Sequence, residues 1–390
     1  MATHGMWKLI DLFLNLYDNK LCLIPYKISI PNRQLLLKPK LSKTRRYFLK
    51  FCTLFVLCHT LISLIILCLP IFIKPERSDS TQASETVQVV RVYVLLIATL
   101  FPPTFLAMSY VISFTPVVAE VIVSSIAQFQ KEARELISTH QAYNYYVAEL
   151  AMKLMLWVSF SISFPVPFVV TYLKIDPLYA LFEGDREERY FILQILVRIV
   201  VIFIIFLDVT KAINAFFIVG LMVTCSMNDI LQDLTKSSVN ANSETRLQEV
   251  NLYKKMFIWN KYTNQNFCTF SVPPLIFFGF SVVTLSYYGT IRMAGEMNFL
   301  LYLCLPTIAF FSSCFVIMLI PHAARVVENA ENFIFSRTNW GNLSKFERKT
   351  WKSVRSLGIQ VGPFGYVIKD LKMLALRYIS ENTINLLMTF

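Results

Sequence analysis

Charged side chains are scarce in this chain of 390 residues, since Asp, Glu, Lys and Arg make up 16% while hydrophobic residues make up 55%. A soluble globular protein typically has about 25% charged and about 45–50% apolar residues. The hydrophobic residues fall into seven separate stretches, and each is long enough to cross the roughly 30 Å hydrocarbon core of a bilayer. The composition therefore predicts an all-α membrane protein built as one integrated helical domain.

The residues and motifs of enzyme chemistry are also scarce. The chain has four histidines and contains no HExxH, Cys-x-x-Cys, Walker or GxGxxG motif, so nothing in it suggests a metal, cofactor or nucleotide site. Glycine accounts for only 10 of the 390 residues, although transmembrane helices are usually rich in glycine. We therefore expect no enzyme, and we expect none of the glycine-broken helices that are typical of secondary transporters.

The seven predicted spans and the basic residues around them set the expected topology. The net charge of +12 could indicate a nucleic-acid partner, but basic residues also gather on the inner side of membranes. With the N-terminus inside, the four inner segments hold 23 basic residues and the three outer segments hold seven. This bias predicts a cytoplasmic N-terminus, an extracellular C-terminus and no nucleic-acid partner. The spans are predicted at 47–73, 93–114, 150–173, 190–227, 267–288, 299–320 and 365–390.

Two rival classes of membrane protein remain open, namely G-protein-coupled receptors and secondary transporters. A G-protein-coupled receptor requires the opposite orientation. None of the eight cysteines falls in a predicted outer loop, and neither Asp-Arg-Tyr after the third span nor Asn-Pro-x-x-Tyr in the seventh is present. These absences weigh against the first rival.

The inner half of the protein is predicted to contain helices that leave the membrane. Residues 1–46 form a cytoplasmic segment whose apolar stretch 9–17 is expected to lie along the inner interface. Residues 47–320 form the first six spans, and the fourth is too long for a bilayer, so it should project inwards with Asp208 and Lys211 paired on one face. Residues 321–364 form a cytoplasmic anchor region, with a capping box at Ser344 and Glu347 and a helix to about Leu357.

The last span, 365–390, carries the most polar residues. Asp370, Arg377, Glu381 and Asn385 project to one side of a helix, and Asn382 and Thr389 lie beside them. Because charges in hydrocarbon are costly, this side must face protein or water. Two interpretations stay open: an Arg377–Glu381 ion pair buried against neighbouring helices, or a direct role in a pore.

The whole architecture resembles that of the insect gustatory receptors, which are related to the insect odorant receptors. The shared features are the inverted topology, the overlong fourth helix, the cytoplasmic helix before the seventh, and a chain that closes on the seventh. That family ends on Thr-Tyr, five apolar residues and Gln-Phe, where this chain has Asn382-Thr383, Ile384 to Met388, and Thr389-Phe390. Thr389 therefore replaces Gln, and Asn385 interrupts the apolar run.

The resemblance implies a ligand-gated, nonselective cation channel in the plasma membrane of chemosensory neurons. It would be a homotetramer or would assemble with other gustatory receptor subunits, surrounded by membrane lipid. The seventh helix would line the pore for permeant cations, and the resemblance places the gate at Thr389 and Phe390. We expect the pore and gate residues to be Asn382, Asn385, Leu386, Thr389 and Phe390.

The same resemblance implies a pocket for a small-molecule tastant in the outer half of the bundle. We look there for aromatic rings beside a few polar groups. Each tyrosine could instead be an interfacial anchor, and Arg198 lies too deep for easy exposure, so it should face a cavity or a partner. The mostly aromatic lining favours bitter or plant-derived compounds over sugars, with a sugar receptor and an odorant receptor as alternatives. The candidates are Ser163, Tyr172, Gln194, Arg198, Tyr287, Tyr288 and Tyr302.

Overall fold

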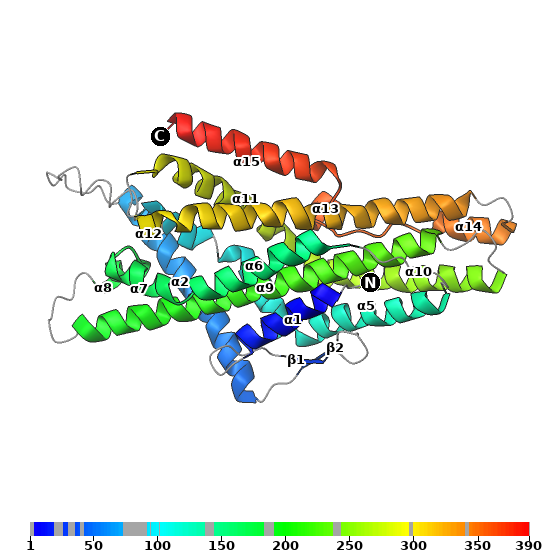
Figure 1. The fold of residues 1–390 in the computed structure, drawn as a ribbon, viewed down its shortest axis with the longest axis horizontal. Coiled ribbons are helices and arrows are strands. Elements are labelled where there is room, and N and C mark those ends of the chain that lie inside the picture. Colours follow the sequence, from blue (N-terminus) through cyan, green and yellow to red (C-terminus); the bar gives the residue numbers. More distant parts are fainter. Residues whose placement is uncertain are drawn as a thin grey trace.

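The protein is nearly all-helical, as the computed structural model in Figure 1 shows. One short hairpin departs from a purely helical fold: β1 (Tyr26–Ser29) pairs antiparallel with β2 (Leu36–Pro39), with Tyr26 opposite Pro39. Two four-residue strands do not change the fold class. The structure describes residues 4–18, 26–29, 36–39, 43–72, 92–93, 95–100, 102–136, 144–182, 191–236, 243–295, 299–339 and 343–389.

The helices of the described residues vary widely in length. They are α1 (His4–Tyr17), α2 (Lys43–Phe72), α4 (Pro103–Phe114), α5 (Pro116–Leu136), α6 (Tyr146–Ile162), α7 (Pro165–Tyr172), α8 (Pro177–Phe182), α9 (Phe191–Lys236), α10 (Ser243–Thr263), α11 (Thr269–Arg292), α12 (Phe299–Tyr302), α13 (Cys304–Thr338), α14 (Lys345–Ser353) and α15 (Asp370–Thr389).

Four of these helical segments are long and apolar enough to cross a membrane, namely 47–68, 191–236, 244–292 and 305–338. A fifth span results if α6 and α7 are counted together, because they pass the same test as a pair bent by 47°. The chain is therefore a multi-pass membrane protein. The third span predicted at 150–173 corresponds to α6 and α7 and is bent between them, since Pro165 at the start of α7 has no backbone N–H to continue the hydrogen bonds of α6.

Three helices extend far beyond the length of a single span. The predicted overlong fourth helix is confirmed, because α9 has 46 residues. The fifth predicted span corresponds to α11, which forms the C-terminal part of a longer continuous helix. In that helix α10 continues through a π-helical turn (Asn264–Cys268) into α11. Figure 1 shows the far ends of α9, α10 and α13 beside α5 and α14, at the end of the molecule opposite α7, α8 and α12.

Helix α1 packs one face against the bundle. Its apolar side chains, among them Met6 at 1% and Tyr17 at 0% exposure, pack with α6 and α9 in one core cluster. Its polar side chains Lys8, Asp11 and Asn15 are exposed, so the helix buries one face and leaves the other open. That residues 9–17 lie along the inner membrane interface stays a prediction.

The last helix begins later than predicted. Helix α14 ends at Ser353 instead of about Leu357, and the chain then runs without α-helix until Asp370. Gly362 and Gly365 have φ of 51° and 97°, which an L side chain rarely adopts, so the chain turns there and cannot start a helix at 365. Helix α15 then packs against α11 and α13, through Ala375 and Ile379.

Candidate functional site

The N-terminal part of α9 is held by Arg198, which forms a buried ion pair with a carboxylate. Arg198 is 5% and Asp176 1% exposed, and the Arg198 Nε donates to both Asp176 carboxylate oxygens at 3.1 Å. Its Nη2 forms an ion pair with Asp176 and donates to the Thr171 carbonyl at 3.1 Å. The guanidinium also stacks 5.0 Å from the ring of Tyr179. Arg198 was expected to face either a cavity or a partner, and in the structure it faces a partner, Asp176.

Sequence reasoning missed Asp176, although the sequence contained a signal. Asp176 stands directly before Pro177, the first residue of α8, and its Oδ1 accepts a hydrogen bond from the Tyr179 amide at 3.0 Å. Aspartate followed by proline is a typical helix start. The same carboxylate therefore caps α8 and neutralises Arg198, which ties the loop after α7 to α9.

Ser163 belongs to a polar network in the core between α6 and α9. Its hydroxyl donates to the Ser159 carbonyl at 2.8 Å and lies 3.4 Å from the Thr210 hydroxyl. The Asn214 amide donates to the Ser159 hydroxyl at 2.7 Å and to the Tyr17 hydroxyl at 3.2 Å. These hydrogen bonds join α1, α6 and α9, so they account for a fully buried Ser163 without a ligand.

The predicted aromatic residues of α11 and α12 form a second group. The Tyr287 hydroxyl lies 2.8 Å from that of Ser313 on α13, and the Tyr302 hydroxyl donates to the Thr290 carbonyl at 3.0 Å. Tyr288 packs beside the cluster that contains Tyr93. These side chains connect helices at the outer end of the bundle. Whether they also contact a ligand stays a prediction.

Two further candidates lie apart from both groups. Tyr172 is 84% exposed at the end of α7, as expected of an interfacial aromatic anchor. Gln194 is half-buried on the first turn of α9. Neither takes part in the contacts of Arg198 described above.

A cavity of about 230 Å³ lies deeper in the bundle, where the sequence predicted none. Its wall comes mainly from α5, α9, α10, α11 and α13, with further residues of α1, α2, α4 and α15 and of the chain before α15. None of the seven predicted ligand residues is part of this wall. The predicted Asp208–Lys211 pair is confirmed at 2.6 Å and borders the cavity. Among the residues that the structure describes, no group of His, Cys, Asp or Glu could hold a metal ion.

The predicted pore residues 382, 385, 386 and 389 lie on the C-terminal half of α15. Asn385 and Thr389 are exposed, with the Thr389 hydroxyl donating to the Asn385 carbonyl at 2.7 Å. Asn382 and Leu386 are half-buried, and the Asn382 amide donates back to its own helix. Phe390 lies outside the described residues. In Figure 1 the C-terminal end of α15 points to the same end of the molecule as α12.

The Arg377–Glu381 pair exists, but it is not buried. The Arg377 Nε donates to the Glu381 Oε1 at 2.7 Å, and the two side chains are 78% and 57% exposed. The expectation that neighbouring helices of the same chain cover the pair is therefore wrong. The buried side of α15 is filled by Ala375, Ile379 and Thr383, which leaves the charged side facing outwards.

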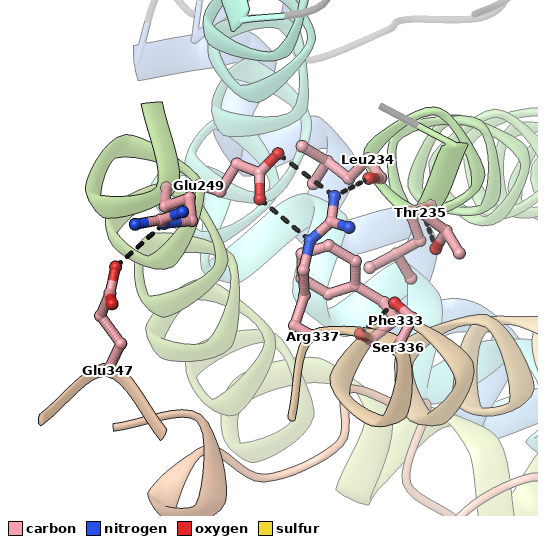
Figure 2. Close-up of polar contacts among 9 residues, drawn as sticks. Leu234, Thr235, Glu249, Phe333, Ser336, Arg337 and Glu347 are labelled. Atoms are coloured by element: carbon pink, nitrogen blue, oxygen red, sulfur yellow. Dashed lines mark hydrogen bonds and ion pairs between the residues drawn. The ribbon is translucent and has the colours of Figure 1, made fainter. Parts of the chain in front are cut away.

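A second buried ion pair holds the long helices together at their ends beside α14 (Figure 2). Arg337 on α13 and Glu249 on α10 are both 2% exposed, and the Arg337 Nε donates to Glu249 at 3.0 Å. Arg337 also donates to the Leu234 carbonyl near the end of α9. The predicted capping box of Ser344 and Glu347 is confirmed, and Glu347 accepts a 3.0 Å bond from Arg246 on α10.

An aromatic cluster covers this ion pair. Trp351 on α14 is 1% exposed and meets the ring of Phe333 edge-on at 5.4 Å, while Tyr253 stacks on Phe333 at the same distance. The Arg337 guanidinium lies 5.1 Å from the Phe333 ring. The short helix α14 is therefore docked onto α10 and α13 through its single buried tryptophan.

Comparison with solved structures identifies the fold. The insect olfactory receptor OR5 from Machilis hrabei in complex with eugenol superimposes with a TM-score of 0.67 at 11% identity, covering 99% of this chain and 98% of that one. A second structure of the same receptor gives a TM-score of 0.63 at 11% identity, covering 97% and 96%. No protein-family model matches the sequence, and no curated protein matches it. The chain therefore has the fold of an insect olfactory receptor over essentially its whole length.

Proposed function

We propose that this chain is a subunit of a ligand-gated, nonselective cation channel of the insect gustatory receptor type, in the plasma membrane of chemosensory neurons. The observation that carries the proposal is the likeness of the whole chain to an insect olfactory receptor. The proposed topology has seven spans, a cytoplasmic N-terminus and an extracellular C-terminus. The excess of basic residues in the inner segments supports this orientation.

The exposed side of α15 supports an oligomer with a central pore. Arg377 and Glu381 lie on that side, and charged side chains facing hydrocarbon would be costly. Four copies of the chain arranged with α15 innermost would place these charges in water. The outer residues Asn385 and Thr389 would then border the ion path, and Asn382 and Leu386 would lie at its margin.

The ligand is proposed to be a small organic molecule that binds in the outer half of the bundle. The olfactory receptor OR5 was solved in complex with eugenol, which supports a small, largely apolar ligand in a receptor of this fold. The aromatic side chains Tyr287, Tyr288 and Tyr302 agree with a bitter or plant-derived compound better than with a sugar. An odorant receptor of the same superfamily is the second candidate, favoured by the same structural likeness.

Electrical recording from cells that express the full chain tests this function. A plant-metabolite panel should evoke cation currents that a sugar panel does not, and an epitope tag at residue 1 should stain only permeabilised cells. Staining of intact cells would instead indicate the orientation of a G-protein-coupled receptor. Saturating solute uptake without unitary currents would indicate a transporter.

The gate can be tested at the end of the chain. Phe390→Ser should hydrate a hydrophobic constriction and raise the resting current, whereas Thr389→Val should lower the single-channel conductance because it removes a hydroxyl from the ion path. Receptors that carry Phe390→Ser, reach the surface and keep unchanged resting and evoked currents would show that the gate lies elsewhere.

A further inference from the structure

Helix α15 carries two opposite charges close together on its exposed side. The Arg377 Nε donates to the Glu381 Oε1 at 2.7 Å, one helical turn away, and the two side chains are 78% and 57% exposed. Apolar side chains lie on that side before and after the pair, since Leu374 is 65% and Met388 83% exposed. Asp370 is also exposed there, but it lies about 10 Å further along the helix axis. The pair is therefore a compact group without net charge between two apolar turns.

The surroundings of this pair favour water over lipid or protein. Helix α15 meets α11 and α13 through its opposite side, which holds Ala375, Ile379 and Thr383, and Figure 1 shows it along the margin of the bundle. Charged side chains in hydrocarbon are costly, and enclosing an ion pair in a dry protein interface carries a desolvation penalty. Two charges four residues apart on one helix pair without help from a second subunit. The exposed side of α15 at this level is therefore best placed in water.

Four copies of the chain with α15 innermost would bring four such pairs around one ion path. A ring of carboxylates selects cations and a ring of arginines selects anions. Several carboxylates at one point also favour Ca²⁺, whose affinity rises with the number of charged ligands. Here each carboxylate of Glu381 has the guanidinium of Arg377 within hydrogen-bond distance. The two rings would therefore largely cancel each other.

We propose that Arg377 and Glu381 together set the ion selectivity of the pore, an inference that rests on the channel function proposed above. Glu381 attracts permeant cations. Arg377 neutralises each Glu381 carboxylate from one turn earlier in the helix and so keeps the ring of carboxylates from holding divalent cations. The charge balance between the two residues, and not the fold of α15, is what the proposal makes decisive, because both side chains are exposed.

Reversal potentials of the currents that the plant-metabolite panel evokes, recorded from cells expressing the full chain, test this balance. Arg377→Gln uncovers the carboxylates and should raise the calcium-to-sodium permeability ratio about fivefold, the factor expected when a unit charge about 4 Å away in water is removed. Glu381→Gln leaves a ring of arginines and should raise the chloride-to-sodium ratio by about the same factor. The double variant has no charge at either position, so both ratios should return close to those of the wild type.

Two control variants separate this effect from a general effect of charge. Arg377→Lys keeps the positive charge beside Glu381 and should keep both permeability ratios close to those of the wild type. Lys255→Gln also removes one positive charge, but from the exposed pair between Lys255 on α10 and Glu132 on α5. It should leave both ratios unchanged, because that pair lies away from α15. Surface biotinylation confirms that each variant reaches the plasma membrane.

A second measurement needs no ion current. A charged, membrane-impermeant methanethiosulfonate reagent reacts with thiols that are in water, so its rate of reaction reports which side of α15 is wet. In isolated membranes, Arg377→Cys should react much faster than Val200→Cys, which is 53% exposed in one subunit but lies in the apolar run of α9. Thr383→Cys, on the buried side of α15, should also react slowly. The wild-type chain supplies the background of its own cysteines.

The outcomes distinguish failure of this inference from failure of the proposed function. Evoked currents whose permeability ratios stay unchanged in both single variants, or a double variant that keeps the shift of one of them, would overturn the inference and leave the channel intact. Reaction of Arg377→Cys as slow as that of Val200→Cys would overturn both the inference and the placing of α15 at the centre. A receptor that reacts rapidly at position 377 but passes no ion current would overturn the channel function and, with it, any part of the pair in ion selection.

Discussion

Loss of the guanidinium of Arg337 should destabilise the inner end of the protein more than any change at its surface. Arg337 and Glu249 are each 2% exposed, and Arg337 hydrogen-bonds both carboxylate oxygens of Glu249, at 3.0 and 3.2 Å. Arg337→Met would leave the Glu249 carboxylate buried without its cation. Breaking a buried pair in this way costs about 3–5 kcal/mol. At about 2 °C per kcal/mol the melting temperature should fall by roughly 6–10 °C.

Intrinsic tryptophan fluorescence of the purified receptor, heated at a fixed rate, measures this change. Trp351 is suited as a reporter because it packs on Phe333, the ring that the Arg337 guanidinium covers. Arg246 supplies the control, since its pair with Glu347 has a similar distance but is about a fifth exposed. Arg246→Met should cost no more than about 1 kcal/mol.

A double substitution separates the ion pair from the packing. Replacing Arg337 by Met and Glu249 by Leu together should recover most of the lost stability, because no charge is then buried alone. The reasoning is refuted if Arg337→Met lowers the melting temperature no more than Arg246→Met does. It is equally refuted if the double variant melts no higher than Arg337→Met.

Three further changes test other contacts. Ser344→Ala removes the capping box and should cost about 0.5–2 kcal/mol of helix stability, measured by hydrogen exchange in α14. The Ser344 hydrogen bonds lower the pKa of Glu347. The difference in stability from wild type should therefore be present at neutral pH and shrink as the pH falls through that lowered pKa. Arg198→Met leaves the buried carboxylate of Asp176 without its cation and should cost about 3–5 kcal/mol of folding stability. The loss should appear as reduced expression at the cell surface. Arg198→Leu also removes the charge and should reduce surface expression in the same way. Arg377→Ala breaks an exposed pair and should leave the melting temperature of the isolated subunit essentially unchanged. A loss of stability confined to the assembled receptor would place this side of α15 against other subunits.

The comparison of sequence and structure is clearest at α9 and α14. The uninterrupted apolar run after residue 190 predicted a helix longer than a bilayer, and α9 has 46 residues. Ser344 and Glu347 predicted a capping box, and both hydrogen bonds are present. These features are local, since helix continuation and capping depend on residues within one or two turns.

The same local reasoning fails where residues from distant parts of the chain determine which side of a helix is buried. An amphipathic stretch such as α1 can turn its apolar side to a membrane or to other helices with the same pattern, and only the tertiary structure shows that this side packs on α6 and α9. The Arg377–Glu381 pair follows from spacing, but its exposure depends on which side of α15 meets α11. Phe390, the last predicted gate residue, lies outside the described residues, so its role stays a prediction.

What the sequence determined by itself is the class of the molecule: a helical membrane protein with helices longer than a bilayer, because hydrophobic run length and helix capping are properties of the chain. Only the tertiary structure decided how the polar groups are paired. Asp176 reaches Arg198 from 22 positions away, and Glu249 reaches Arg337 from 88. It also left the hydroxyl of Thr263 buried without a hydrogen-bond partner. Such contacts depend on how helices pack against one another, and the pattern of residues along a single segment does not predict that packing.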